Sequence, residues 1–400
     1  MNDMSASAVP ELTVMKSLEG KINAHFAAAD FVHIDPAIMQ PADVYLQQIG
    51  EAVRGRTYVF TDNDGEELCL RPDLTVPAAR VFLEQKDSFG DKARVYYSGP
   101  TFRYPQFGPE SDEAQGSSSR EFRQAGIEIF GKEDPEKAEA ETLALTVQAL
   151  KEVGATDFSI RLGDLGLFTA LLGAIDMPER WRKRLNENFW RHEEFTRILG
   201  QLKAPQESEI EPTLKKLLQK ITDQNPKEAE AEVAQYLADK AIPLIGARSL
   251  SEITQQLSAQ AMDLIAEPLC ETKVELIEQY LEISAPPKAV GARLEDLAEK
   301  SDLDLSHALE SYQKRIEWLN KLEVDLSKAE FTAEFGRNLE YYTGFVFQIE
   351  KTSLGKEGQI AGGGRYDNLL ESLGAAKSLP AIGSAIHLDR LSTLLEGEVL

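Results

Sequence analysis

The stretch RVYYSGPTFRYPQFGPESDEAQGSSSREFRQAGIEIFG, residues 94–131, predicts two strands joined by a long polar loop. β-prone residues dominate the first strand, which Gly99 and Pro100 are expected to interrupt. From residue 120 to residue 130, side chains alternate with the period of two that is typical of a β-strand. The stretch therefore predicts a β-hairpin.

The second strand of this hairpin places two polar side chains on one face. That face carries Phe122, Gln124, Gly126, Glu128 and Phe130, and the other carries Arg123, Ala125, Ile127 and Ile129. Because the glycine between them has no side chain, Gln124 and Glu128 can form the floor of a small polar pocket. Arg103 ends the first strand and is expected to reach the same pocket. A plain hairpin with one solvated face is the alternative that the pattern leaves open.

Length and composition exclude several classes of protein. The 400 residues suffice for two or three domains, and 42% hydrophobic with 28% charged residues is typical of a soluble globular protein. The net charge of -24 repels phosphate backbones, so we expect no nucleic-acid partner. No apolar run reaches the length of a membrane span, so we expect no membrane association either.

The cysteine content indicates the cellular compartment, and the absence of known motifs excludes some kinds of chemistry. Only Cys69 and Cys270 are present, far apart, which favours a reducing compartment without disulfides. The N-terminus lacks a basic segment followed by an apolar one, so we expect no signal peptide and a cytoplasmic protein. There is no GxxxxGK[ST] phosphate loop, no HExxH pattern and no metal-ligand spacing. We therefore predict no metal site and no cofactor.

Further elements flank the central hairpin. Helical spacing predicts helices over 11–29 and 76–85, and a helix capped by Asp134 that ends before Gly154. Strand patterns occupy 31–36, 157–162, 329–337 and 341–350, and a second hairpin spans 56–75. The glycines of 361–367 indicate a close backbone approach by a ligand or another strand, or a turn. Residues 379–394 predict a strand that runs into a helix.

The segment from 163 to about 322 differs in composition from both flanks. Charged helical patterns dominate it, such as DLSHALESYQKRIEWLN at 304–320, and prolines punctuate it. We interpret it as a mostly helical insertion whose charged faces are solvated.

Six separate motifs, in order, resemble the core of the histidyl-tRNA synthetases, which have the class II synthetase fold. They are LRPDLT at 70–75, GPTFR at 99–103, REFRQAGIEIFG at 120–131, GRNLEYYTGFVF at 336–347, AGGGRYD at 361–367 and IGSAIHLDRL at 382–391. The resemblance covers roughly residues 10–165 and 325–395. It implies an α+β fold, an antiparallel sheet flanked by helices, with core parts at 1–165 and 324–400. The helical insertion would occupy 166–323, and no anticodon-binding domain would follow.

The resemblance also implies a histidine site. Asp73, Thr75 and Gln124 would hold the α-ammonium group, Glu128 and Tyr342 would contact the imidazole, and Arg337 would face the carboxylate. Arg103, Tyr341 and Tyr366 would complete the pocket. Asp73 stands where the family has a glutamate. A zwitterion with a polar ring requires carboxylates, an arginine and aromatic walls, so the residue types agree with this ligand.

Departures from the synthetase pattern indicate a different activity. Pro105 replaces a glutamate that would bind adenine, Ser118 replaces an arginine, and the loop FGPESDEAQGSSS is acidic where the synthetases are basic. Such a chain is similar to the regulatory subunits of short-form ATP phosphoribosyltransferases. These pair with a separate catalytic subunit, activate it and convey feedback inhibition by histidine.

This second resemblance implies a non-catalytic chain in histidine biosynthesis. L-histidine would be its ligand and the short-form catalytic subunit its partner. The 31–36 segment resembles the dimer-forming motif 1 and implies a homodimer within a hetero-oligomer. An amino-acid-adenylating enzyme is the alternative, which the retained Arg103, Arg337 and Arg390 favour. A scaffold with a decayed pocket is a third possibility, against which the retained pocket residues argue.

Overall fold

The structure is a computed structural model that describes residues 9–48, 55–104, 120–131, 134–203, 211–222, 224–242, 249–336, 341–351 and 358–397. The chain divides into two compact units. The first combines Met1–Leu171 with Tyr280–Leu400, and the second is Leu172–Gln279. Arg337, Pro105 and Ser118, with the rest of the acidic loop, lie outside the described residues.

A nine-stranded sheet forms the centre of the first unit, with strand order β1-β5-β6-β12-β11-β10-β7-β9-β8. The strands are β1 (Val32–His33), β5 (Ala93–Phe102), β6 (Glu121–Phe130), β7 (Ser159–Asp164), β8 (Ser284–Ala285), β9 (Ala329–Thr332), β10 (Phe345–Glu350), β11 (Gln359–Arg365) and β12 (Ala381–His387). Only β1 with β5 and β7 with β9 pair in parallel among these strands. The predicted α+β class with a largely antiparallel sheet is confirmed.

The central hairpin is present, but its first strand is not interrupted at Gly99 and Pro100 as predicted. β5 pairs with β6 along its whole length, with Pro100 opposite Arg123. The Pro100 carbonyl accepts a hydrogen bond of 2.8 Å from Arg71 Nε, and the Arg123 N–H donates to Asp389 at 2.5 Å. Both groups point away from the shared ladder, so the missing N–H of Pro100 removes no ladder hydrogen bond.

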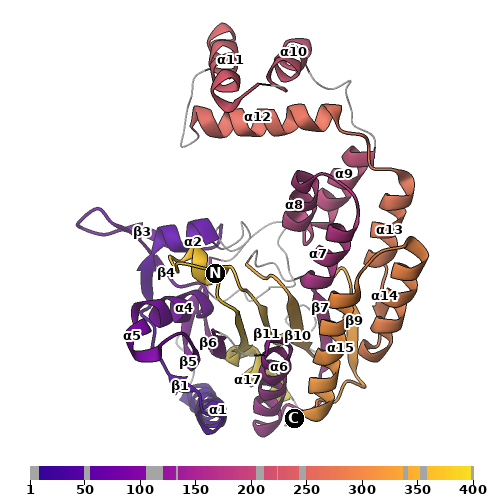
Figure 1. Ribbon diagram of the computed structural model, residues 1–400. Coiled ribbons are helices and arrows are strands. Elements are labelled where there is room, and N and C mark those ends of the chain that lie inside the picture. The colour runs from indigo at the N-terminus through magenta and orange to yellow at the C-terminus, as the bar shows by residue number, and fades with distance from the viewer. Residues whose placement is uncertain are drawn as a thin grey trace. The chain divides into compact units, whose positions relative to one another are not determined.

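Helices cover one face of the sheet (Figure 1). They are α1 (Val9–Ala28), α6 (Pro135–Glu152) and α17 (Leu388–Gly397), which pack on β5, β6, β11 and β12. Asp134 caps α6 as predicted, because its carboxylate accepts from the Lys137 N–H at 3.2 Å. α14 (Pro287–Ser301) packs on α15 (Ser306–Lys321), which packs on α6, and both belong to the first unit.

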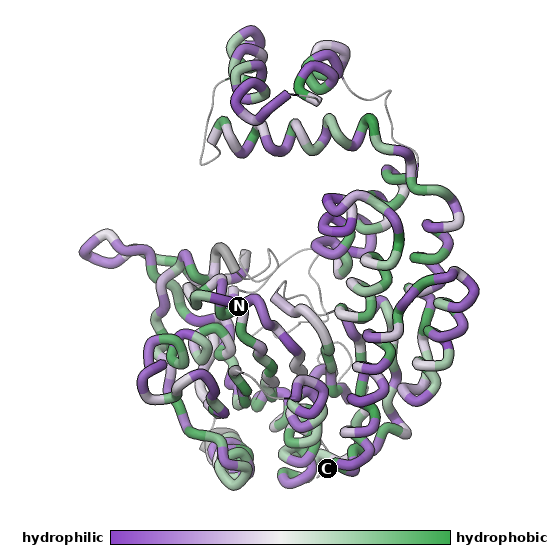
Figure 2. The backbone as a smooth tube through the Cα atoms, viewed as in Figure 1, coloured by the Kyte–Doolittle hydropathy of each residue, from purple (hydrophilic) through white to green (hydrophobic). Residues whose placement is uncertain are grey.

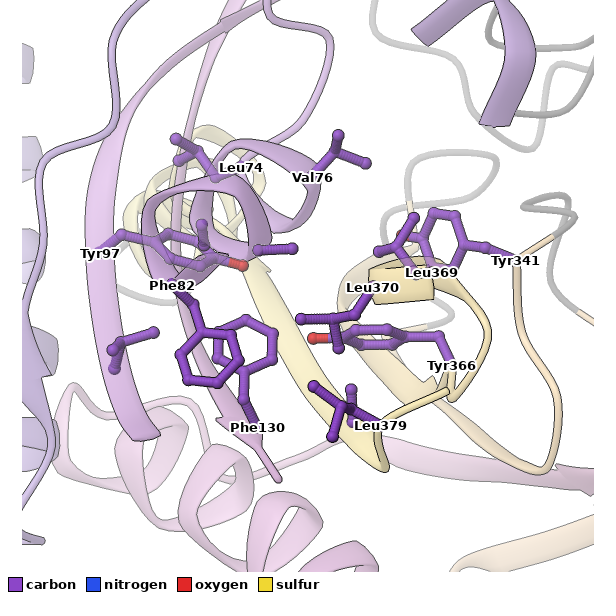
Figure 3. Close-up of a cluster of buried hydrophobic side chains, with 14 of the residues drawn as sticks. Leu74, Val76, Phe82, Tyr97, Phe130, Tyr341, Tyr366, Leu369, Leu370 and Leu379 are labelled. Atoms are coloured by element: carbon purple, nitrogen blue, oxygen red, sulfur yellow. The ribbon is translucent and has the colours of Figure 1, made fainter. Parts of the chain in front are cut away.

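The face of the sheet opposite these helices meets smaller elements. They include a three-stranded sheet with the order β2 (Met39–Pro41), β4 (Glu67–Leu70) and β3 (Val59–Thr61). They also include the helices α2 (Ala42–Gln48), α4 (Thr75–Glu84), α5 (Lys86–Phe89) and α16 (Leu369–Ser372). Apolar side chains from α4, β5, β6 and α16 join in one core cluster, in which the Phe82 and Phe130 rings stack 4.8 Å apart (Figure 3). This cluster supports one side of the site described below.

The second unit contains only helices among its described residues. After α7 (Leu165–Ala174) these are α8 (Glu179–Asn188), α9 (His192–Lys203), α10 (Pro212–Ile221), α11 (Pro226–Asp239), α12 (Leu250–Ile265) and α13 (Glu271–Leu281). Hydrophobic and hydrophilic residues alternate along these helices (Figure 2), and α10, α11 and α12 bury Leu218, Val233 and Ala261 between them. No helix that the structure describes is both long enough and apolar enough to cross a membrane.

One prediction about the charged helices is wrong at a single position. The faces of 304–320 were expected to be solvated, but Arg315 is only 3% exposed. It lies between α15 and α6, where its guanidinium group contacts two carboxylates. A buried guanidinium needs such partners, and sequence spacing alone does not reveal them.

Candidate functional site

A cavity of about 130 Å³ lies on the face of the sheet that carries Gln124. Asp73, Thr75, Arg103, Gln124, Tyr341, Tyr342 and Tyr366, all predicted from the sequence, line it. Gly336, Gln348, Gln359, Gly362, Gly383, Ser384, Ala385, His387 and Arg390 complete the lining. The cavity thus brings together residues from six separate segments of the chain, and among the predicted residues that the structure describes only Glu128 is not in the lining.

Two hydrogen-bond acceptors in this cavity are buried and unpaired. Asp73 is 5% exposed and Gln124 is 3% exposed. Asp73 Oδ1 accepts from the Val76 N–H at 3.1 Å, but Asp73 Oδ2 and Gln124 Oε1 have no hydrogen-bond partner among the described residues. A buried acceptor without a partner costs about 1–3 kcal/mol. The cavity therefore suits a ligand that donates hydrogen bonds, and a cationic donor suits it best.

The charge state of Asp73 depends on opposing effects. Burial, the largest effect, raises the pKa of Asp73, while the hydrogen bond from Val76 and the positive charge of Arg103 lower it. Asp73 is held in place because it lies two residues before the start of α4 and accepts from an N–H in the first turn of that helix. An ammonium group bound here would supply the hydrogen-bond donor that Asp73 Oδ2 lacks.

Glu128 lies beneath the cavity and is fully buried. The Tyr97 hydroxyl donates to Glu128 Oε1 at 2.7 Å, and the Tyr366 hydroxyl donates to Oε2. These hydroxyls come from opposite sides and point toward each other (Figure 3). Burial raises the pKa of Glu128 to about 7, although both hydroxyls favour the ionised form. The carboxyl group can therefore gain or lose its proton near neutral pH.

Gly383 makes room for this carboxylate. Strand β12 places Gly383 directly opposite Glu128, and a Cβ atom on Gly383 would lie 1.4 Å from Glu128 Oε2. The glycines of β11 serve a similar purpose, since a Cβ on Gly363 would lie 2.2 Å from the Gly383 carbonyl oxygen. The neighbours that require glycine are thus other strands, one of the alternatives that the sequence left open.

Aromatic rings and arginines form the remaining walls. The rings of Tyr341 and Tyr342 lie 4.8 Å apart, and those of Tyr341 and Tyr366 lie 5.6 Å apart. Arg103 Nε donates to the Pro72 carbonyl at 2.9 Å, and burial lowers the pKa of Arg103 to about 10, so it remains charged at neutral pH. Arg390 is 8% exposed and donates to the Gln359 carbonyl at 2.8 Å. The cavity is thus lined by a carboxylate, Asp73, and by two guanidinium groups, Arg103 and Arg390.

The residues that sequence reasoning missed come mainly from β10, β11 and β12, and from β5 in the case of Tyr97. Register explains them, because β12 pairs with β6 so that His387 lies opposite Gln124 and Ala385 opposite Gly126. The period of two in a strand over the motif at 382–391 is the signal that could have placed Gly383, Ala385 and His387 on one face. Among the described residues, no group of three His, Cys, Asp or Glu side chains could hold a metal ion.

Comparisons with known proteins agree on the family. The profile of the histidyl-tRNA synthetase family matches residues 7–247 and 245–391. The ATP phosphoribosyltransferase regulatory subunit of Agrobacterium fabrum is 32% identical over 387 residues, with 95% of this chain and 97% of the relative covered. That of Allorhizobium ampelinum is 30% identical over 384 residues, with 94% and 97% covered.

Solved structures share the fold. A Bacillus halodurans protein described as an ATP phosphoribosyltransferase regulatory subunit/histidyl-tRNA synthetase superposes with a TM-score of 0.62 at 19% identity, covering 98% of this chain and 82% of its own. Histidyl-tRNA synthetase from Nostoc gives a TM-score of 0.63 at 16% identity, covering 100% and 77%. From the sequence relatives and the family profile, this chain belongs to the family of ATP phosphoribosyltransferase regulatory subunits, which are related to the histidyl-tRNA synthetases.

Proposed function

We propose that this chain is the non-catalytic regulatory subunit of an ATP phosphoribosyltransferase and that its cavity binds L-histidine. In this role the chain activates a separate catalytic subunit and conveys feedback inhibition when histidine accumulates. The relatives named above support the regulatory role. The histidine ligand rests on the cavity itself.

The unpaired oxygens of Asp73 and Gln124 are the observation that carries the ligand assignment. A carboxylate oxygen and a carboxamide oxygen, both buried in one cavity, are suited to the N–H groups of an α-ammonium group. The Thr75 hydroxyl lies beside them in the lining. Few other small metabolite groups combine a positive charge with several donors in so small a volume.

The remaining groups of the ligand follow from this anchor. The imidazole is directed toward Glu128 and the Tyr342 ring, where a carboxylate can accept from a ring N–H. The carboxylate is directed toward arginine, with Arg337 as the family's contact and Arg103 in the cavity lining. Tyr341 and Tyr366 enclose the ring between aromatic faces.

Feedback inhibition requires two states of the assembly that bind histidine with different affinities. A homodimer of this chain, docked on catalytic subunits, would supply such an assembly. Cys69 and Cys270 are both free, which agrees with a cytoplasmic location. The adenylating enzyme is the second candidate because Arg103 and Arg390 both line the cavity, but the named relatives favour the regulatory subunit.

Calorimetry with ligand fragments tests the ligand assignment. L-histidine should bind the isolated chain, whereas imidazole-lactate, which has a hydroxyl group in place of the ammonium group, should bind roughly 10- to 150-fold more weakly. Histamine, which keeps the ammonium group and lacks the carboxylate, serves as the matched probe of the arginine end. Equal affinity for histidine and imidazole-lactate would show that the unpaired acceptors are not the anchor.

A further inference from the structure

Five charged side chains, three of them buried and two partly buried, form a cluster on the face of β11 opposite the cavity. The charge cluster consists of Glu139 from α6, Asp164 from β7, Arg315 from α15, Arg365 from β11 and Asp367 just beyond it. Glu139, Asp164 and Arg315 are each at most 5% exposed. None of these residues lines the cavity that contains Asp73 and Gln124.

Ion pairs link all members of the charge cluster. Arg315 Nε lies 2.5 Å from Glu139 Oε2, and Arg315 Nη1 lies 2.7 Å from Asp164 Oδ2. Arg365 Nη1 lies 3.3 Å from Glu139 Oε1, and Arg365 Nε lies 2.7 Å from Asp367 Oδ2. Apolar residues of similar volume often stabilise a core as well as such a cluster does. A gain in folding stability is therefore a weak explanation for these charges. A role in holding a neighbouring segment in place explains them better.

Arg365 is the member of the cluster that is adjacent in sequence to a residue of the cavity lining, Tyr366. Side chains alternate between faces along β11, so Arg365 points to the charge cluster while the next residue, Tyr366, points into the cavity. Tyr366 in turn donates to Glu128. Arg365, in the charge cluster, and Tyr366, which contacts the buried Glu128 carboxylate, are thus adjacent residues in the chain.

The backbone around Arg365 is held on both sides. Its carbonyl accepts from the Thr343 N–H at 2.8 Å, and the Asp367 N–H donates to Thr343 Oγ1 at 3.1 Å. The Tyr366 N–H donates to the Ala381 carbonyl at 2.8 Å, and the Ala381 N–H donates to Asp367 Oδ1 at 3.1 Å. Thr343 directly follows Tyr341 and Tyr342, so the same contacts hold the segment that carries the other two tyrosines.

We propose that Arg365 is a positioning residue of the histidine site, because its ion pairs with Glu139 and Asp367 fix the end of β11 and hold the Tyr366 hydroxyl on Glu128. The inference rests on the proposed function, since it concerns how the same cavity recognises the ring of its ligand. Arg315 supports Arg365 indirectly, by holding Glu139 between two guanidinium groups.

The groups around Glu128 predict a specific effect on its proton. Tyr97 from β5, Tyr366 beyond β11 and Thr75 from α4 provide hydroxyls that favour the ionised form, and the nearby charge of Asp73 opposes it. On β12 the facing residue is Gly383, which has no side chain. Displacement of the Tyr366 hydroxyl would remove the largest of the ionising contacts. The pKa of Glu128 would then rise further.

Arg365→Met in the full chain tests the proposal, with calorimetric titration of L-histidine between pH 6 and pH 9. We expect roughly 10-fold weaker binding at pH 7, from the loss of one charge-assisted contact. The ratio of variant to wild-type dissociation constants should rise as the pH falls from 9 to 7. The ligand's own titrations are common to both proteins and cancel in this ratio. A constant ratio across the range would overturn the proposal.

Arg94→Met is the matched control. Arg94 joins β5 to α6 through Glu141, which is two positions from Glu139 on the same helix, at 2.7 Å, and lies outside the cavity lining. This variant removes an ion pair between the same helix and the same sheet, and its histidine affinity should equal that of the wild type. A loss equal to that of Arg365→Met would contradict a specific role for Arg365.

A double-mutant cycle with Tyr366→Phe shows whether Arg365 acts through that hydroxyl. In the Tyr366→Phe background, Arg365→Met should cause little further loss, whereas additive losses would refute the route through Tyr366. Arg365→Lys, which keeps the charge, provides a variant that retains folding and should lose less affinity than Arg365→Met. Failure of the wild-type chain to bind histidine would instead contradict the proposed function.

Discussion

Replacement of Glu128 by glutamine separates what this carboxylate does for the ligand from what it does to the fold. Glu128→Gln keeps the shape and removes the charge. The change should weaken histidine binding by about 1.5–3 kcal/mol, the range for a hydrogen bond to a charged group. That corresponds to a rise of roughly 10- to 150-fold in dissociation constant.

The same substitution should stabilise the chain without ligand at high pH. Burial raises the pKa of Glu128 from 4.5 to about 7, so the folded chain holds this proton more tightly than the unfolded chain does. The stability of the wild type therefore falls as the pH rises from 4.5 to 7, and the full penalty of roughly 3 kcal/mol is present above pH 7. Glutamine avoids that penalty, and its amide group can pair with the hydroxyls of Tyr97 and Tyr366.

Denaturant unfolding at pH 8 and pH 5, together with calorimetry, measures both effects. We expect Glu128→Gln to raise the free energy of unfolding at pH 8 by up to about 3 kcal/mol and to change it less at pH 5. The pH 5 measurement on the same variant is the internal control. A variant that binds histidine as the wild type does, or that is less stable than the wild type at pH 8, would refute this account of the carboxylate.

Three further predictions concern space, chemistry and assembly. Gly383→Ala should abolish histidine binding, because the added Cβ would lie 1.4 Å from the Glu128 carboxylate. Gly173→Ala is the control, because no atom lies within 4 Å of the Cβ added there. Histidine binding by Gly383→Ala would contradict the geometry. The purified chain should not catalyse histidine-dependent exchange between ATP and pyrophosphate, and exchange above background would support the adenylating enzyme. Light scattering should find a homodimer at micromolar concentration, and a strict monomer would count against the proposed assembly.

Much of the fold could be predicted because its signals are local. The period-two pattern of β6 depends on adjacent residues, so it correctly placed Gln124 and Glu128 on one face with Gly126 between them. The cap of α6 is equally local, since Asp134 and Lys137 are three positions apart. Pro100 misled the prediction because its effect depends on which strand edge its nitrogen faces, and only the pairing with β6 determines that edge.

The rest of the site depends on register and on contacts between distant segments. Tyr97 reaches Glu128 only because β5 and β6 pair as they do, and Gly383 matters only because β12 places it opposite that carboxylate. The partners of Arg315 are 151 and 176 positions away in the chain. A charged residue on a helix looks the same in sequence whether it is solvated or paired in the core.

We propose that histidine acts on the assembly through the cavity around Asp73. The most direct measurement is histidine inhibition of the reconstituted complex, with the wild-type chain or with Asp73→Asn bound to the catalytic subunit. We predict that Asp73→Asn still activates the catalytic subunit but raises the histidine concentration for half inhibition roughly tenfold or more. Unchanged inhibition by histidine in a complex that contains Asp73→Asn would contradict the claim.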